Sequence, residues 1–268
     1  MVRLYDHPLS PYAQKVKLAL IEKGIEFETM LPANLGSGEA ATEFTRANPR
    51  AEVPALVDGN VLIFDSTIIL EYIEEKWPAP ALLPATPGER ARVRMVEDAM
   101  DTHYEAINWG LAEIAFFERA SGQLAQQINA AAAEQVAGWH AWLESQLGDA
   151  TWFNGESFGW GDISVIPYIN GSAGFGLAPP RGSKLADWTT RANARASVKS
   201  VSQAANNVSM GDNPAGMAAV RDLLEKGLFK REYRDHRLEW MIKSGGLSVV
   251  SDGLDKHNIR FTPVFAKA

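Results

Sequence analysis

The chain has 268 residues, of which 46% are hydrophobic and 22% charged, and its net charge at pH 7 is −7. This composition is typical of a globular protein and excludes a disordered chain, while the acidic balance argues against a nucleic-acid partner. The sequence contains no cysteine, which excludes disulfide bonds and any mechanism that uses a protein thiol.

No stretch of the chain approaches the roughly 18 consecutive apolar residues that a membrane-spanning helix needs. Near the N-terminus, the residues Asp6, His7, Lys15 and Lys17 interrupt every apolar run, so the pattern of a signal peptide is missing. We therefore expect a cytoplasmic protein that has no membrane partner.

Strands and helices alternate in the first part of the chain. Ser10 followed by Pro11 marks a helix start, because a hydroxyl caps the helix and proline fits its first position. Asp58-Gly59 is a typical hairpin turn. The predicted elements are a strand over Val2–Asp6, a helix from Ser10 to Gly24, a strand over Ile25–Leu31, a short helix over Glu39–Arg46, a hairpin of Val53–Val57 and Val61–Phe64, and a helix from Ser66.

After a proline-rich linker at residues 84–88, the pattern becomes helical. We therefore predict an α/β domain over residues 1–84, an all-α domain over 89–210 and a helical extension over 211–268. The predicted helices are Glu89–Arg119, Gln123–Leu147, Asp162–Asn170, Leu185–Val201, Tyr233–Lys243 and Leu247–Lys256.

Three motifs follow one another in the first domain. They are Ser10-Pro11-Tyr12, Asn48-Pro49-Arg50-Ala51-Glu52-Val53-Pro54-Ala55-Leu56 and Phe64-Asp65-Ser66-Thr67-Ile68-Ile69-Leu70-Glu71-Tyr72-Ile73. Each motif alone is weakly specific, but their order around the hairpin turn, ahead of an all-helical region, is specific. In these motifs the chain resembles the glutathione S-transferase superfamily, and within it the bacterial serine-type members.

The resemblance implies a thioredoxin-like α/β domain followed by an all-α domain, and it does not extend to the C-terminal tail. Gly159-Trp160-Gly161-Asp162 departs from the family, which usually has a hydroxyl residue as the cap of this buried helix, and Ala196 stands where proline is common. Members that run thiol–disulfide exchange have a cysteine at the position of Ser10, so that chemistry is excluded here.

The resemblance further implies that the reactive group is the thiol of bound glutathione, a co-substrate, and that Ser10 is catalytic. Lowering a thiol pKa by two units takes about 2.7 kcal/mol. The start of a helix contributes about 0.3–1 kcal/mol, and a hydroxyl that donates to the thiolate contributes roughly 1.5–3 kcal/mol. Together the two contributions suffice, whereas neither comfortably does so alone. Tyr12 is a rival donor, and His7 is the one histidine close enough in sequence to act on Ser10.

The same resemblance assigns the residues that would hold glutathione. Val53 would pair with the peptide through its backbone, next to a cis bond to Pro54. Asp65 and Ser66 would hold the γ-glutamyl end, and Glu52 stands where the family often has Gln or Lys. The alternative readings are an ordinary edge proline and a serine that only caps a helix.

The second substrate is expected to be a small hydrophobic electrophile in an apolar pocket. Its lining is predicted to include Tyr12, His103, Tyr104 and Ile107, with Trp109 and Tyr168 nearby, although an aromatic stripe at helical spacing is also what a packed core produces. No histidine pair has the spacing of a metal site, so we expect no metal. By analogy, we expect a homodimer.

Three functions remain open at this level: a conjugating or dehalogenating transferase, a glutathione-dependent lyase that cleaves aryl ethers, and a binding module without activity. The basic tail residues, among them Arg231 and Arg237, would either form a solvated face or fold over the cleft.

Overall fold

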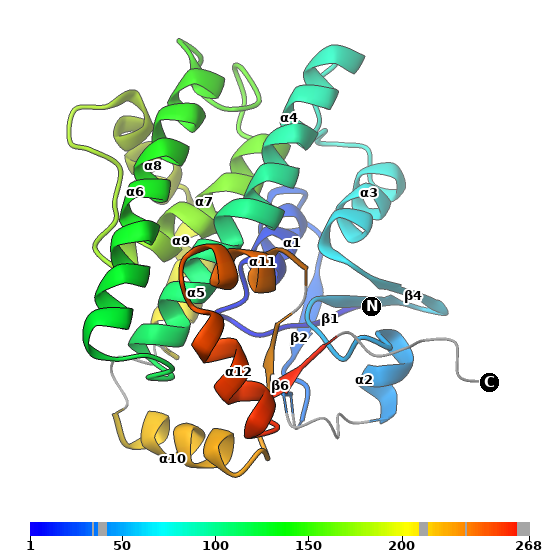
Figure 1. The fold of residues 1–268 in the computed structure, drawn as a ribbon. Coiled ribbons are helices and arrows are strands. Elements are labelled where there is room, and N and C mark those ends of the chain that lie inside the picture. Colours follow the sequence, from blue (N-terminus) through cyan, green and yellow to red (C-terminus); the bar gives the residue numbers. More distant parts are fainter. Residues whose placement is uncertain (34, 37–41, 209–213, 234, 262–268) are drawn as a thin grey trace.

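The computed structural model describes residues 1–33, 35–36, 42–208, 214–233 and 235–261. A mixed sheet with its helices is followed by a larger helical body, and the tail returns to the sheet side of the molecule (Figure 1). The expected short helix over Glu39–Arg46 lies partly outside the described residues, and its described part belongs to α2 (Thr42–Ala47).

The sheet has four strands in the order β2-β1-β3-β4. The strand β1 pairs in parallel with β2 and antiparallel with β3, and β3 pairs antiparallel with β4. The strands are β1 (Val2–Tyr5), β2 (Phe27–Met30), β3 (Ala55–Asp58) and β4 (Val61–Phe64). This confirms the thioredoxin-like arrangement and the hairpin turn at Asp58-Gly59.

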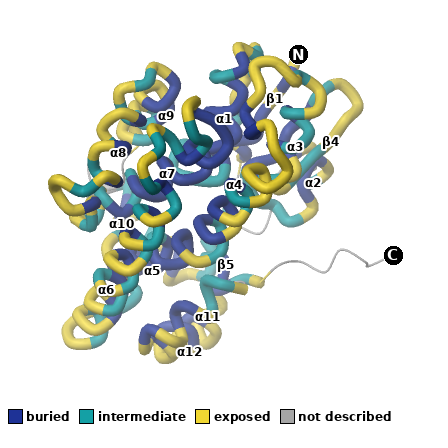
Figure 2. The backbone as a smooth tube through the Cα atoms, turned by 90° about the horizontal axis from the view of Figure 1, so that it is seen from above, coloured by how far each residue is buried: buried dark blue, intermediate teal, exposed yellow. Residues whose placement is uncertain are grey.

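Alternate residues of β1 and β3 point to opposite faces of the sheet, and both faces are covered. Leu4 and Leu56 belong to the main core, together with residues of α1 (Pro11–Glu22) and α3 (Ser66–Lys76). On the opposite face, Tyr5 packs against Phe44 of α2, with ring centroids 5.1 Å apart. The helix α1 is mostly buried (Figure 2), because the helical body covers its outer side.

The helical body comprises α4 (Pro87–Ala99), a π-helical turn η1 (Met100–Tyr104), α5 (Glu105–Ala115), α6 (Gly122–Leu147), α7 (Trp160–Gly174), α8 (Lys184–Ala194) and α9 (Ala196–Asn206). The predicted long helix over Glu89–Arg119 is continuous through α4, η1 and α5, but it contains the π-helical turn and ends at Ala115. The predicted helix over Leu185–Val201 is two helices, since Arg195 has extended backbone angles. Among the described residues, none of the helices is long and apolar enough to cross a membrane.

The start of α7 shows why glycine occupies position 159. The carboxylate of Asp162 accepts hydrogen bonds from the Gly159 and Phe153 N–H groups. A Cβ at Gly159 would lie 2.2 Å from Nδ2 of Asn154 and 2.4 Å from the Leu82 carbonyl oxygen. The Asn154 amide oxygen also accepts a hydrogen bond from the Gly161 N–H. A neighbouring side chain thus pairs with a backbone N–H at the helix start, as the hydroxyl cap does in the family.

The tail forms α10 (Pro214–Glu225), β5 (Arg231–Glu232), α11 (Asp235–Lys243), α12 (Leu247–Asp255) and β6 (Ile259–Arg260), with β5 parallel to β6. Tyr233, Trp240 and Met241 are buried in the main core. Gly110 of α5 allows this close packing, because a Cβ there would lie 1.9 Å from the Trp240 ring. The tail is thus packed on α5.

Candidate functional site

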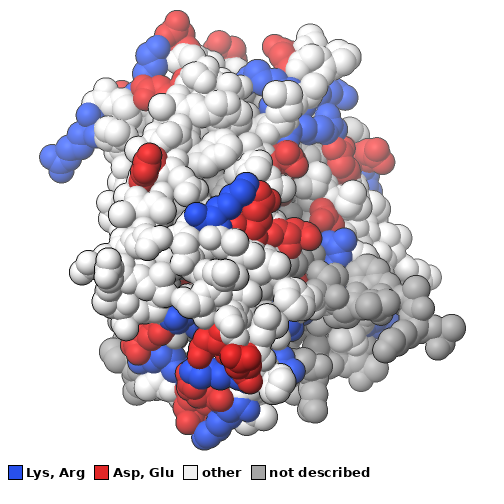
Figure 3. Space-filling view, viewed as in Figure 1, with Lys and Arg blue, Asp and Glu red and all other residues white. Residues whose placement is uncertain are grey.

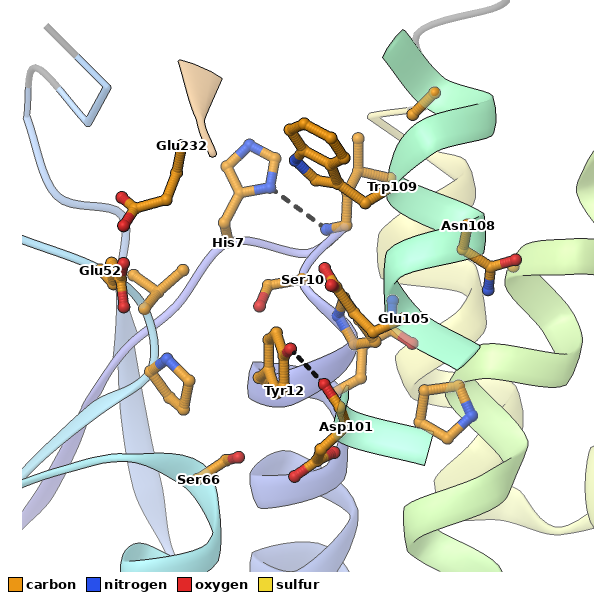
Figure 4. Close-up of a pocket in the computed structure, with 18 of the residues that line it drawn as sticks. His7, Ser10, Tyr12, Glu52, Ser66, Asp101, Glu105, Asn108, Trp109 and Glu232 are labelled. Carbon is orange, nitrogen blue, oxygen red and sulfur yellow. Dashed lines mark hydrogen bonds between the residues drawn. The ribbon is translucent and has the colours of Figure 1, made fainter. Parts of the chain in front are cut away.

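A cavity of about 1180 Å³ lies where the β1–α1 loop, the loop before β3, the start of α3, α5 and the tail meet. Ligand pockets usually measure about 300–1,000 Å³, so this cavity has room for two small molecules. The described wall includes residues of all three sequence motifs, namely Ser10, Tyr12, Glu52, Val53, Pro54, Asp65 and Ser66 (Figure 4).

Ser10 lies at the start of α1, where the structure confirms the predicted cap. Its backbone N–H donates to the His7 carbonyl at 2.8 Å, which closes a tight turn after β1. Its Oγ accepts a hydrogen bond from the Ala13 N–H at 3.3 Å. Because the oxygen acts as the acceptor, the hydroxyl hydrogen can be donated to an anion in the cavity.

Tyr12 lines the cavity, but its hydroxyl is already engaged. The hydroxyl donates to the carbonyl oxygen of Asp101 at 2.8 Å, and its oxygen lies 3.4 Å from Nε2 of His236. The carbonyl belongs to the π-helical turn, a feature that is frequent at functional sites. Tyr12 is therefore a weaker donor candidate than Ser10.

Val53 and Pro54 lie in the wall just before β3, and the bond between them is cis, as predicted. Among the described residues, none forms a hydrogen bond with the backbone N–H or C=O of Val53. Val53 is half-buried in the cavity wall, so its unpaired backbone groups can accept a peptide ligand as an added strand.

Asp65 and Ser66 differ from the prediction in which of the two residues caps α3. The cap of α3 is Asp65, whose Oδ1 accepts from the Thr67 and Ile68 N–H groups, whereas the sequence predicts Ser66 as the cap. Ser66 is the first helical residue, so its hydroxyl is not used for capping. Asp65 also lies 3.7 Å from the Arg50 guanidinium and has φ 75°, a conformation that is rare for a residue with a side chain.

Beneath the cavity floor, a buried ammonium joins the two parts of the protein. Nζ of Lys15 lies 2.6 Å from Glu97 and 2.5 Å from Asp101. Trp160 donates to Glu97, and the Tyr168 hydroxyl donates to Asp101 at 2.6 Å. Burial, together with the nearby Glu97, raises the pKa of Asp101 to about 6 in spite of Lys15. Tyr168 therefore supports the floor and does not line the cavity.

Three residues predicted for the second-substrate pocket are not brought into the cavity. His103 is exposed and stacks on Trp139, with ring centroids 5.6 Å apart. The Tyr104 hydroxyl is buried 2.9 Å from Oγ of Ser172, and Ile107 lies in the main core.

The reason for this correction is the orientation of the helix. The aromatic stripe that suggested a pocket marks the face that packs into the core. The face directed at the cavity mixes polar and apolar residues at helical spacing: Glu105, Asn108, Trp109, Ala112 and Phe116. The spacing of these residues can be read from the sequence, but the charged residue Glu105 among them obscured the pattern.

The tail closes the cavity through ion pairs that sequence reasoning missed. Arg237 donates three hydrogen bonds to the two carboxylate oxygens of Glu105, the shortest at 2.7 Å, and His236 lies 2.9 Å from the same carboxylate. Burial opposes ionisation of Glu105, but the Arg237 guanidinium and the hydrogen bond with His236 outweigh it and lower the pKa of Glu105 to about 2. Arg237 is thus neither part of a solvated face nor free to pair with a substrate.

A second contact joins the tail to the loop before β3. Glu232 is 6% exposed and faces Glu52 across the edge of the cavity (Figure 4). Burial and this neighbouring carboxyl raise the pKa of Glu232 to about 7, although Arg260 lies 2.6 Å away. Neighbouring carboxyls disfavour ionisation of each other, so this arrangement favours a form in which the pair keeps one proton, and Glu52 faces the tail.

On the face shown in Figure 3, basic and acidic side chains are interspersed. No group of three or more metal-ligating side chains occurs in the described part of the chain.

The fold and the cavity define a two-domain protein of the thioredoxin-like plus all-α class. Residues 4–81 match the family model of the glutathione S-transferase N-terminal domain. The chain is 31% identical over 193 residues to "Maleylacetoacetate isomerase" of Pseudomonas aeruginosa, covering 69% of this chain and 90% of that protein. It is 32% identical to "Glutathione S-transferase U28" of Arabidopsis thaliana, over 63% of this chain and 71% of that protein.

Solved structures agree with the sequence comparisons. A glutathione S-transferase from Rhodospirillum rubrum has 27% identity and a TM-score of 0.64, over 75% of this chain and 91% of that one. A glutathione S-transferase from Methylobacterium radiotolerans, solved with glutathione sulfonate, has 30% identity and a TM-score of 0.62, over 75% of this chain and 93% of that one. The chain belongs to the glutathione S-transferase family.

Proposed function

We propose that the protein is a cytoplasmic glutathione transferase that activates the glutathione thiol as a thiolate and adds it to an apolar or aromatic electrophile. The observation that carries this proposal is the position of Ser10. Its hydroxyl lies in the cavity wall at the N-terminus of α1, and its oxygen already accepts the Ala13 N–H. The hydroxyl hydrogen and the helix dipole then both favour a thiolate.

The glutathione would lie along the wall that the sheet domain supplies. The unpaired backbone of Val53 supports strand-like pairing with the cysteinyl part of the peptide, and Ser66 and Asp65 support a site for its γ-glutamyl end. Glu52 is a weaker candidate, because its carboxyl faces Glu232.

The proposal is tested by titrating the thiolate absorbance of enzyme-bound glutathione in wild type and in Ser10→Ala. We expect a thiol pKa below the ordinary value of about 8.5 in wild type, and a rise of one to two units in the variant, about 1.4–2.7 kcal/mol. Tyr12→Phe is the matched control, since its hydroxyl donates to the Asp101 carbonyl. An unchanged pKa in Ser10→Ala together with a raised one in Tyr12→Phe would contradict the assignment.

Isomerisation is a second candidate, because the relative from Pseudomonas aeruginosa, of which 90% is covered, is named an isomerase. A lyase would use the same thiolate. Turnover of isomerisable, ether and halide substrates separates these reactions. Retention on immobilised glutathione with no turnover of any of them would indicate a binding module.

We also propose a homodimer. A shallow groove of mixed polar and apolar lining lies over β4 and the start of α3, and its apolar residues Leu62 and Ile68 are 41% and 56% exposed. Exposed apolar side chains that adjoin one another often mark an interface.

A further inference from the structure

His7 is a cavity residue that the proposed mechanism does not use. It follows β1, and its carbonyl oxygen accepts the Ser10 N–H at 2.8 Å, so His7 and Ser10 are the two ends of one tight turn. The imidazole is fixed within this turn, because its Nδ1 accepts a hydrogen bond from the Leu9 N–H at 3.2 Å. Its ring belongs to the wall of the cavity.

This hydrogen bond determines the tautomer of the ring. A nitrogen that accepts a hydrogen bond carries no proton, so the proton of the neutral ring is on Nε2. Burial lowers the pKa of His7, and the charges of Lys17 and Arg231 lower it further, against the opposing effect of Asp6. Near pH 7 the ring is therefore neutral, with Nε2–H as its donor.

The donor points toward the tail side of the cavity. Figure 4 shows Nε2 directed away from the Ser10 hydroxyl, toward the region between Glu232 and Trp109. Among the described residues, none accepts a hydrogen bond from this nitrogen, and it is not sealed from the cavity. A thiolate held by Ser10 and the donor of His7 would thus face a second substrate from different directions.

We propose that His7 is a second catalytic residue, which donates a hydrogen bond from Nε2 to an oxygen of the electrophile on which negative charge develops. This inference rests on the proposed function and specifies the substrate class as conjugated carbonyl compounds. The thiolate sulfur forms a bond to the β-carbon, the π pair of the C=C bond forms a double bond between the α-carbon and the carbonyl carbon, and the π pair of the C=O bond moves to the oxygen, which gives an enolate. His7 stabilises that oxygen, and water then supplies the proton to the α-carbon. A fixed neutral imidazole suits this role, because it donates without first having to be protonated.

Two variants of His7 distinguish the loss of the Nε2–H donor from disruption of the turn. In His7→Asn, the side-chain oxygen can accept the Leu9 N–H as Nδ1 does, since asparagine forms such turns readily, but the donor at the Nε2 position is lost. In His7→Gln, the longer amide can place an N–H near that position. Thermal unfolding of both variants checks that the turn is intact.

The measured quantity is the ratio of the kcat/KM values for two substrates, each of which carries one phenyl ring. 4-Phenyl-3-buten-2-one develops charge on a carbonyl oxygen, whereas benzyl chloride loses a halide. We expect His7→Asn to lower the ratio of kcat/KM for the ketone to kcat/KM for the chloride by about tenfold to a hundredfold, mostly through kcat. His7→Gln should recover a large part of this ratio, and the pKa of bound glutathione should stay within a few tenths of wild type in both.

Several results would overturn the inference. An unchanged ratio in His7→Asn excludes a donor role toward the carbonyl. A thiol pKa that rises in His7→Asn as it does in Ser10→Ala would assign His7 to the sulfur instead. Turnover of benzyl chloride without turnover of the ketone by wild type refutes the inference and leaves the proposed function standing, whereas turnover of neither compound removes both.

Discussion

At the scale of single residues, Ser10 has two compatible roles. Its oxygen caps α1 and its hydrogen remains available to the cavity, so the cap and the donor do not compete. Its sequence context, a hydroxyl before proline, predicts the cap from local chemistry alone. Tyr12 has the same donor chemistry, but its hydroxyl bonds Asp101, which is 89 positions later. No local pattern could distinguish these two hydroxyls.

Lys15 provides a prediction at this scale. Its side chain is fully buried between two carboxylates, and removing one partner of a buried ion pair leaves an uncompensated charge. We expect Lys15→Met to lower the free energy of unfolding by about 3–5 kcal/mol, measured by urea denaturation. Lys76→Met is the control, because its partner Asp58 is near the surface and such pairs contribute about 0–1 kcal/mol. Similar losses in the two variants would contradict this account of Lys15.

At the scale of elements, the start of α7 shows how packing overrides a local preference. A hydroxyl residue is a good N-cap, and its absence at Gly159 looks like a weakness in the sequence. In the structure, Asn154 and the Leu82 carbonyl occupy the space in which a Cβ would lie. The glycine is required by contacts with residues outside the helix.

The corresponding prediction is that Gly159→Ser, which restores the usual cap, destabilises the protein. We expect a loss of about 1–3 kcal/mol, since overfilling a packed site forces neighbours to move. Differential scanning calorimetry measures it. Gly138→Ser, on the exposed side of α6 with no atom within 4 Å of its Cβ position, is the matched control. Equal or increased stability in Gly159→Ser would disprove the packing explanation.

At the scale of the whole molecule, the tail and the sheet domain together form the cavity. Glu105 of α5 holds α11 through Arg237, and Glu232 of β5 meets Glu52 of the sheet domain. Because the second contact raises the pKa of Glu232, its contribution to stability depends on pH.

The sign of this dependence follows from the raised pKa of Glu232. Between its ordinary value of about 4.5 and its folded value of about 7, the folded state retains a proton that the unfolded state releases. Stability therefore falls as pH rises through this window. We expect Glu232→Gln to raise Tm at pH 8, by a free energy on the order of 1–3 kcal/mol, and to change Tm little at pH 5. Glu239→Gln, an exposed pair with Lys243, is the control. A Tm difference that is the same at both pH values would contradict the raised pKa of Glu232.

The homodimer belongs to the same scale. We expect Leu62→Arg to convert a dimer to a monomer in light scattering, because a guanidinium would be buried in an apolar contact. Leu254→Arg, at a site of similar exposure on α12, should leave the dimer intact. A monomeric wild type would refute the proposal at once.

The sequence by itself determined the order of strands and helices along the sheet domain, the start of α1 and the hairpin turn, because these follow from local propensities. That Ser10, Val53-Pro54 and Asp65-Ser66 contribute to one site was predicted by the resemblance to a known family that the three motifs carry. Only the tertiary structure decided which face of α5 is directed at the cavity and that the tail closes the site. The physical reason is that these outcomes depend on contacts between residues a hundred or more positions apart, or on which of the two faces of a helix packs into the core. A local sequence pattern specifies neither of these.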